Sequence, residues 1–354
     1  MSTLPSADWH ELARALFLPV LVFLSYWDSL KGSYVIDDME GIAGYDGKPQ
    51  WKLDKKAGGY APLNFHTFLR WARWHAGKLP NPNLNWKKDK QPPFGSHPRI
   101  HHRLNLVIAS ACSVLLYFFL AQIMDRNLAW LSTALFIVHP LGCQTIAWIS
   151  GIGYILSFLF MLIGLNVALL TQPWLGSIQG TMASVLLVGV FQLLAIQAQF
   201  AQMGAAVIYA FLGLWPHAIV SAFLALTVCR PVLQDAVVIR VKTFRDQQMG
   251  ASTHVHFRKI IVALKSLYYY TKMSLFPKRL GLYHTYGYHY ELPYIEAEDK
   301  YLFLGILSLI GWVVLFFLGP AVIKFSVLWY FAFLLLFLHW ITIHQFVSER
   351  YNWI

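Results

Sequence analysis

Long apolar stretches decide the fold of this chain, and the clearest is residues 152–170, which read IGYILSFLFMLIGLNVALL. This stretch contains no charged side chain. A helix that crosses a membrane needs about 20 predominantly apolar residues, and fewer where it is tilted or shielded by its neighbours. The stretch therefore predicts a transmembrane helix.

The composition extends this prediction to the whole chain. Of its 354 residues, 57% are hydrophobic and 13% are charged, and the mean hydropathy is +0.49. A soluble domain of this length could not bury so much apolar surface. We therefore predict an all-α, polytopic integral membrane protein whose residues 1–354 form a single membrane domain.

By the same measure we predict about nine transmembrane helices. They cover residues 13–29, 104–124, 127–140, 152–170, 181–198, 203–215, 217–229, 301–318 and 321–341. We predict two helices bent at Pro216 within 203–229, and the alternative is one long helix, which would lower the count by one and invert the topology of the second half. No small-residue cleavage site follows the first apolar segment, so we expect it to be retained as an anchor.

With nine spans, all the long loops fall on one side of the membrane. These segments are 30–103, 139–151, 199–202, 230–300 and 342–354. Within two of them, residues 60–75 and 260–276 combine apolar and aromatic side chains with Lys and Arg. That pattern is typical of interfacial or re-entrant helices, so we expect such helices in the two large loops.

The net charge of +11 lies mostly in the polar tracts between spans. Anionic lipid head groups or a phosphorylated lipid are the counter-charges available there, so we expect membrane lipid as a partner and not nucleic acid. Cys112, Cys143 and Cys229 are well separated in apolar sequence. Their spacing indicates small core residues, without a zinc site or a disulfide framework.

Three carboxylates stand in the first polar segment after the first predicted span. Residues 34–42 read YVIDDMEGI and include Asp37, Asp38 and Glu40. A carboxylate at such a boundary can accept a proton from a hydroxyl or hold a cation, and a solvated turn is the alternative. Oxygen ligands suit Mg²⁺ or Mn²⁺, but no second ligand cluster accompanies them in the sequence, so we predict no metal site.

Candidate phosphate ligands stand on the same predicted side. His139, before Pro140, can donate to a phosphate or a sugar hydroxyl, and a helix cap is the alternative. Lys272, Lys278 and Arg279 can neutralise a lipid phosphate, or else attract anionic lipid in general.

The last candidates are Glu349, Arg350 and Tyr351. Arg350 can clamp a phosphate bidentately if it turns inward, and an ordinary surface pair with Glu349 is the alternative.

Several short motifs, taken in order along the chain, resemble the landmarks of a known family. They are Tyr34 to Asp38, Tyr60-x-Pro62-Leu63, His102 to Asn105, His139-Pro140 with Trp148 to Gly151, Tyr270 to Pro277, and Glu349-Arg350-Tyr351. Their order and spacing are similar to those in the membrane-embedded halves of the protein O-mannosyltransferases that carry tetratricopeptide repeats. These enzymes belong to the GT-C glycosyltransferases.

The resemblance implies a GT-C-like fold and transfer of a sugar from a polyprenyl-phosphate carrier to an acceptor hydroxyl of a protein or glycan. The reaction would take place on the extracytoplasmic face of a bacterial inner membrane or of the endoplasmic reticulum. Asp37 or Asp38 would be the base, and Arg350 with the basic residues of 272–279 would neutralise the phosphate. His139 would line the pocket. The lipid-phosphate sugar is the donor, and no further cofactor is implied.

The chain also departs from the family. Gln197-Ala-Gln199-Phe-Ala-Gln202 stands where relatives carry a Lys-Glu pair, tetratricopeptide repeats are absent, and relatives continue beyond the Glu-Arg-Tyr motif. We expect a second subunit that completes the fold, a longer chain, or a loss of catalysis. The alternative function is a non-catalytic, GT-C-like membrane subunit that acts as an assembly or lipid-binding scaffold. A transporter is disfavoured because residues 104–229 contain few ionisable side chains.

Overall fold

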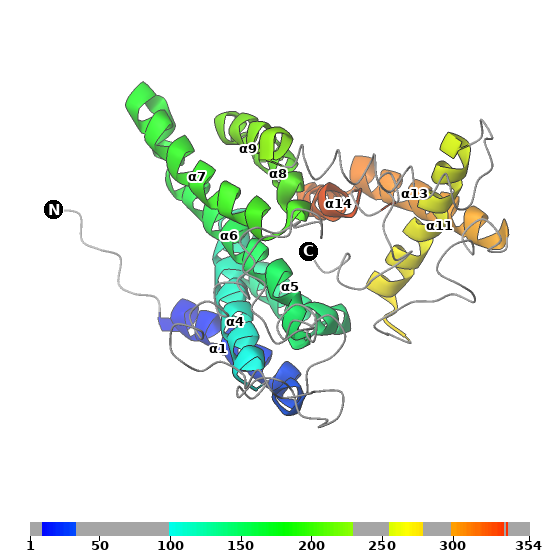
Figure 1. Cartoon of the computed structure of the whole chain (residues 1–354). Helices are drawn as coiled ribbons and strands as arrows, with labels where there is room; N and C mark the ends of the chain where they lie inside the picture. The colour runs from blue at the N-terminus through cyan, green and yellow to red at the C-terminus, as the bar shows by residue number, and fades with distance from the viewer. Residues whose placement is uncertain (1–8, 33–98, 229–254, 279–298, 336–337, 339–354) are drawn as a thin grey trace, which may run out of the picture. The chain divides into compact units, whose positions relative to one another are not determined.

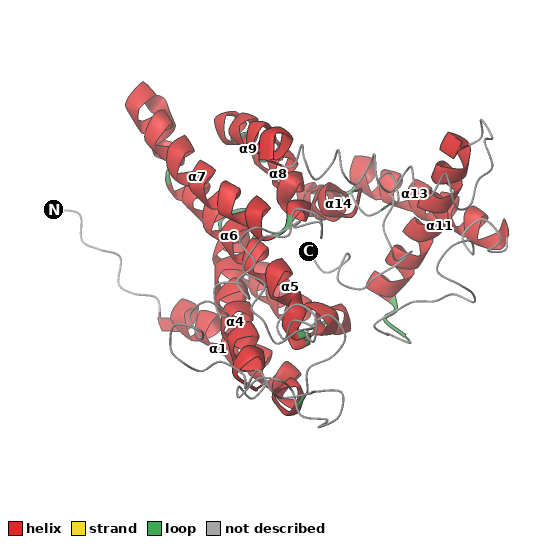
Figure 2. Cartoon of the chain, in the orientation of Figure 1, coloured by secondary structure: helices red, strands yellow, loops and turns green. Residues whose placement is uncertain are grey.

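The computed structural model of the chain describes residues 9–32, 99–228, 255–278, 299–335 and 338 (Figure 1). All regular elements in these ranges are helices, which confirms the predicted all-α class (Figure 2). The chain divides into two compact units. Unit 1 is Met1–Leu175 with Gln197–Gln199, and unit 2 is Gly176–Ile196 with Phe200–Ile354. The predicted single membrane domain over 1–354 stays a prediction.

The described residues of unit 1 form four α-helices. They are α1 (Trp9–Tyr26), α4 (Arg99–Ala121), α5 (Arg126–Val138) and α6 (Ile152–Leu170), and α4 packs against the other three. The large side chains Leu106, Phe119 and Phe158 lie in its buried core. Lipid tails are as apolar as these side chains, so close van der Waals packing between the helices stabilises this core within a membrane.

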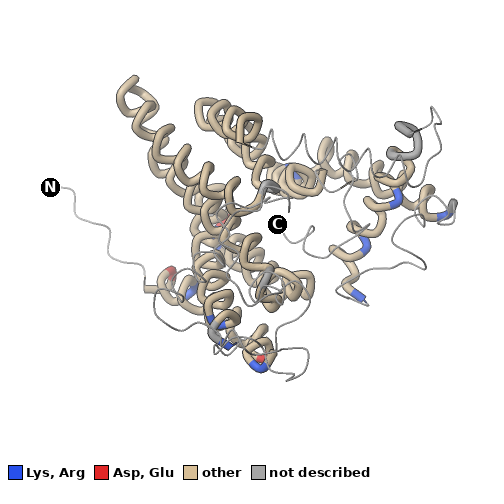
Figure 3. The backbone as a smooth tube through the Cα atoms, viewed as in Figure 1, with Lys and Arg blue, Asp and Glu red and all other residues tan. Residues whose placement is uncertain are grey.

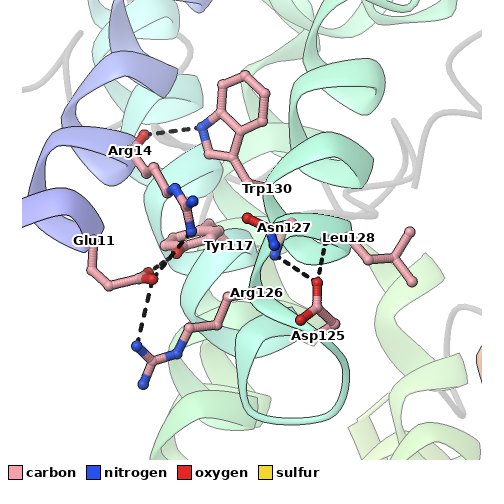
Figure 4. Close-up of polar contacts among 8 residues, drawn as sticks. All are labelled: Glu11, Arg14, Tyr117, Asp125, Arg126, Asn127, Leu128 and Trp130. Atoms are coloured by element: carbon pink, nitrogen blue, oxygen red, sulfur yellow. Dashed lines mark hydrogen bonds and ion pairs between the residues drawn. The ribbon is translucent and has the colours of Figure 1, made fainter.

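The two ends of α5 follow from its sequence. Asp125 is the N-cap, and its Oδ1 accepts hydrogen bonds from the backbone N–H groups of Asn127 (2.9 Å) and Leu128 (3.2 Å) (Figure 4). At the other end His139 has φ −67° and ψ 128°, which is extended backbone. The residue before a proline is disfavoured in the helical region, so α5 ends ahead of Pro140.

Glu11 joins three helices at the end of unit 1 where α1 and α5 begin (Figure 4). Its carboxylate accepts a hydrogen bond from the Tyr117 hydroxyl of α4. Arg14 Nη1 lies 3.3 Å from Glu11 Oε1, and Arg126 Nη1 of α5 lies 3.5 Å from the same oxygen. Trp130 Nε1 also donates to the Arg14 carbonyl oxygen (3.3 Å). One carboxylate therefore fixes the register of α1, α4 and α5.

In unit 2 the described residues form six further α-helices. They are α7 (Ile178–Ala198, without its last two residues), α8 (Ala205–Phe211), α9 (Trp215–Val228), α11 (Val255–Leu275), α13 (Asp299–Leu318) and α14 (Ala321–Leu334). Among them α8 packs against α9 and α14, and α13 packs against α11 and α14. The predicted interfacial segment 260–276 lies on α11, which is a helix, whereas the segment 60–75 lies outside the described ranges.

The stretch 203–229 forms two helices, and the break lies at Gly213 and not at Pro216. Gly213 has φ +74°, a conformation that residues with a Cβ rarely adopt. Its N–H donates to the Ala210 carbonyl (3.0 Å), and the Leu214 N–H donates to the Tyr209 carbonyl (2.9 Å). This pair of bonds is a Schellman motif, which ends α8. Pro216 lies in the first turn of α9, where a helix tolerates it.

Fewer helices than predicted are long enough to cross a membrane. In the described part of the chain five qualify by length and composition: Trp9–Lys31, His101–Ala121, Ile152–Leu170, Ile178–Ala198 and Lys300–Leu318. A sixth is obtained if Arg126–Val138 and Pro140–Ala147, bent by 53°, form one span. The other predicted spans fall on the shorter apolar helices Gln202–Phe211, Trp215–Val228 and Ala321–Leu334. These helices indicate an integral membrane protein with five or six spans among the described residues, not nine.

Candidate functional site

A group of buried polar side chains lies where α4 begins. We call it the polar cluster, and it consists of His101, His102, Asn105, Gln144 and Thr145, whose exposed fractions are 2%, 4%, 0%, 5% and 0%. The first three belong to α4, and the other two belong to the segment between α5 and α6. Polar groups in an apolar environment raise the free energy unless they are paired, so such a cluster is a candidate for binding or catalysis.

The segment between α5 and α6 is irregular. It consists of the 3₁₀ turn η3 (Pro140–Gly142), the π-helical turn η4 (Cys143–Ala147) and the 3₁₀ turn η5 (Ile149–Gly151). Such turns leave some backbone carbonyls without a regular helical partner. Asn105 Nδ2 donates to the carbonyl oxygens of Ile146 (3.2 Å) and Trp148 (2.9 Å), and so holds the segment against α4.

Gly151 closes this segment because a side chain does not fit there. A Cβ on Gly151 would lie 2.3 Å from the Thr145 carbonyl oxygen and 3.0 Å from that of Gln144. A backbone atom cannot move away as the tip of a flexible side chain can. The path of the backbone around Gln144 and Thr145 is therefore tightly constrained.

Both ends of the loop 33–98 lie beside the polar cluster. A Cβ on Gly32, the residue before the loop, would lie 3.0 Å from His102 Nε2. Arg99, the residue after it, donates from Nε to the Leu30 carbonyl oxygen (3.3 Å). Asp37, Asp38 and Glu40 lie outside the described ranges, but the chain leads to them directly from Gly32. The sequence alone does not predict that Gly32 and Arg99, which are separated by residues 33–98, lie beside the same cluster.

Some polar atoms of the cluster have no hydrogen-bond partner in the part of the chain that the structure describes. They are Asn105 Oδ1, Thr145 Oγ1 and both ring nitrogens of His102. The His102 ring faces the backbone of Gly32 and Ala147 without reaching hydrogen-bonding geometry. The great majority of buried polar groups in proteins are paired, so unpaired groups that share one cluster need an explanation.

His139 lies at the same end of unit 1 and acts as a cap. Its Nδ1 accepts a hydrogen bond from the Leu141 N–H (3.3 Å) at the start of η3. The Tyr26 hydroxyl of α1 donates to the Ile137 carbonyl (2.9 Å) and so fixes the end of α5. The alternative of a helix cap therefore describes the geometry of His139. A role in lining a donor pocket stays a prediction.

The predicted cations of unit 2 lie on α11 and just after it (Figure 3). Lys272 and Lys278 are exposed, and Lys272 Nζ lies 5.9 Å from the centroid of the Tyr268 ring. The rings of Tyr268 and Tyr269 both pack on Tyr301 of α13, at centroid distances of 5.9 and 5.3 Å. A Lys side chain can lie along aromatic rings and keep its ammonium group in the hydrated head-group layer, where it can bind phosphate. Arg279, Glu349, Arg350 and Tyr351 lie outside the described residues.

Two features of unit 2 were missed by the sequence analysis. Lys265 of α11 has an exposed fraction of only 1%, although the sequence did not distinguish it from the exposed cations. A Ser184 Oγ to His217 Nε2 hydrogen bond of 2.8 Å joins α7 to α9, and the Tyr209 ring stacks on His217 at 6.0 Å. The available signal was the isolated Ser, Tyr and His in apolar stretches, which is weak until the helices are paired in space.

Among the described residues, no group of three or more His, Cys, Asp or Glu side chains has the geometry to hold a metal ion. Comparisons with family models, with curated proteins and with solved structures found no match to this chain. The functional argument thus depends on the residues themselves.

Proposed function

We propose that this protein is a glycosyltransferase of the GT-C type, which moves a sugar from a polyprenyl-phosphate carrier to an acceptor hydroxyl on the extracytoplasmic side of its membrane. One observation supports the proposal above the others. The motif that begins at His102 and the later motif of His139-Pro140 with Trp148 meet at one end of unit 1, beside Gly32 and Arg99, which flank the residues that include Asp37 and Asp38.

The proposed reaction is a direct displacement. Asp37 or Asp38 takes the proton of the acceptor hydroxyl, the acceptor oxygen bonds to the anomeric carbon, and the bond from that carbon to the phosphate oxygen breaks. The electron pair leaves with the lipid phosphate, whose charge is met by Lys272 and Lys278 together with Arg279 and Arg350. Glu40, Glu349 and Tyr351 complete the proposed site.

The proposal is tested with purified protein and labelled polyprenyl-phosphate sugars. Asp37→Asn and Asp38→Asn remove a charge without changing side-chain size. We expect one of them to lower sugar transfer by about 100-fold or more, because general base catalysis contributes roughly 10²–10⁴-fold. Asp28→Asn is the matched control, since Asp28 is exposed and pairs only with Lys31 (2.8 Å) among the described residues. Full activity of both Asn variants would reject the proposed base.

A second candidate is a non-catalytic membrane scaffold, and the burial of the polar cluster favours it. Side chains held between α4 and the segment after α5 can lock a structure as well as bind a substrate. The same assay separates the two candidates. A scaffold would not turn over the donor in its wild-type form, and neither Asn variant would change its behaviour.

A further inference from the structure

We infer that the polar cluster binds the hydroxyl groups of the sugar on the donor. The inference rests on the proposed function and names residues that the sequence analysis did not assign to a substrate. Its basis is a set of polar atoms of Asn105, Thr145 and His102 that are buried and have no hydrogen-bond partner among the described residues.

The unpaired atoms define what a ligand must offer. Asn105 Oδ1 is a carbonyl oxygen and can only accept a hydrogen bond, while its Nδ2 already donates to Ile146 and Trp148. The Thr145 hydroxyl can donate and accept, and the His102 ring does both when it is neutral. A complementary ligand therefore has groups that donate and accept at short spacing. Sugar hydroxyls have this property.

The absence of a cation from the cluster argues against a phosphate as its ligand. Phosphate sites use Arg or Lys, because charge-assisted hydrogen bonds are about twice as strong as neutral ones. The cations in the first turns of α4 are Arg99 and Arg103, and both are exposed. Arg99 also donates to the Leu30 carbonyl. None of the five members of the cluster is a Lys, Arg, Asp or Glu, which suits an uncharged sugar.

The cluster is also rigid, as a binding site must be. Asn105 holds the segment after α5 by two hydrogen bonds, and Gly151 allows the backbone to fold closely around Thr145. A site whose side chains are already held in place loses little conformational entropy when it binds. If a variant leaves one hydroxyl of the bound sugar without a hydrogen-bond partner, the affinity for the sugar should therefore fall measurably.

Two isosteric substitutions test the inference. Thr145→Val removes the unpaired hydroxyl, whereas Thr133→Val removes an equally buried hydroxyl that is already bonded to the Ala129 carbonyl (2.8 Å). The probes are polyprenyl-phosphate mannose, polyprenyl-phosphate glucose and sugar-free polyprenyl phosphate. We expect Thr145→Val to lower kcat/KM for at least one sugar donor about tenfold, the effect of one hydrogen bond, and to leave binding of sugar-free polyprenyl phosphate unchanged. Thr133→Val should behave as the wild type.

The outcomes separate this inference from the proposed function. If the wild type transfers sugar and Thr145→Val does so equally well, the inference is wrong and the proposed function stands. If Thr145→Val weakens sugar-free polyprenyl phosphate as much as the sugar donor, the cluster does not recognise the sugar. If the wild type neither binds nor turns over any donor, both ideas fail.

A second pair of variants tests His102. His102→Gln, which keeps a hydrogen-bond donor and an acceptor, should lower kcat/KM for the sugar donor less than His102→Phe in the same assay.

Discussion

Two buried threonines of unit 1 differ in whether the hydroxyl is satisfied. Thr133 Oγ1 donates to the Ala129 carbonyl within α5, whereas Thr145 Oγ1 has no partner in the described ranges. An unpaired polar group in an apolar environment raises the free energy of the folded state, so Thr145 is a candidate for binding a ligand. Substitutions at these two threonines therefore test whether the hydroxyl of the polar cluster contributes to folding or to ligand binding.

The same two valine substitutions are expected to change stability in different ways. Thr133→Val should lower the free energy of unfolding by about 0.5–1.5 kcal/mol, because a hydrogen bond is lost and its carbonyl keeps only the helical partner. Thr145→Val should be neutral or stabilising, because no hydrogen bond is lost. Unfolding of each variant in the same detergent, followed by circular dichroism, measures the difference. An equal loss in both variants would mean that the Thr145 hydroxyl is bonded after all.

At the scale of elements, the apolar pattern predicted the positions of the helices well and their breaks poorly. Pro216 was the predicted position of the break, yet α8 ends at Gly213, where a positive φ allows two capping hydrogen bonds. A single glycine in apolar sequence is not sufficient to predict this conformation. Similarly, His139-Pro140 marks the end of α5, but the turns that follow depend on Asn105, which is more than 40 residues away from the segment it holds.

Two glycines of α13 make a matched pair for testing how this helix packs. A Cβ on Gly305 would lie 2.2 Å from the Leu264 carbonyl oxygen of α11, whereas a Cβ on Gly311 would meet nothing within 4 Å. Gly311→Ala should leave stability unchanged or raise it by up to about 1 kcal/mol, because alanine favours a helix. Gly305→Ala should force the two backbones apart and lower stability by about 1–3 kcal/mol. Thermal unfolding checks the order, and a tolerated Gly305→Ala would contradict the close contact of α11 with α13.

For the whole molecule, composition was enough to predict an all-helical membrane protein. The lengths of the apolar stretches, however, gave too high a number of membrane-spanning helices. The predicted helices at 203–215 and 217–229 fall on α8 and α9, of seven and 14 residues, because a hydropathy window does not detect the turn between them. The candidate site was predicted only in part. The sequence analysis grouped His139 with Trp148 in one motif, but it gave His102 and Asn105 no role in a site, because the contacts of Asn105 and Thr145 depend on pairing between segments that no local pattern encodes. Asp37, Asp38 and Arg350 stay predictions.

The path of unit 1 through a membrane gives a topological prediction. Glu11 meets Arg126 where α1 and α5 begin, and Tyr26 meets Ile137 where they end, so the two helices are parallel. In a cysteine-free background, Lys31→Cys should react with a membrane-impermeant thiol reagent from one side of the membrane. Asn127→Cys should react only from the other side, because it lies at the opposite end of the helices. Labelling of both from the same side would show that α1 does not cross.

The shared carboxylate of Glu11 also bears on the order of events during synthesis. The side chains that complete its surroundings, Tyr117 and Trp130, lie more than 100 residues later in the chain. The first helix thus leaves the ribosome long before the groups that neutralise and enclose its acid exist. Until α5 has been translated, the later helices do not compensate the charge of Glu11. While α1 inserts into the bilayer, the nascent chain therefore depends on Arg14, which lies on the same helix, to pair with that carboxylate.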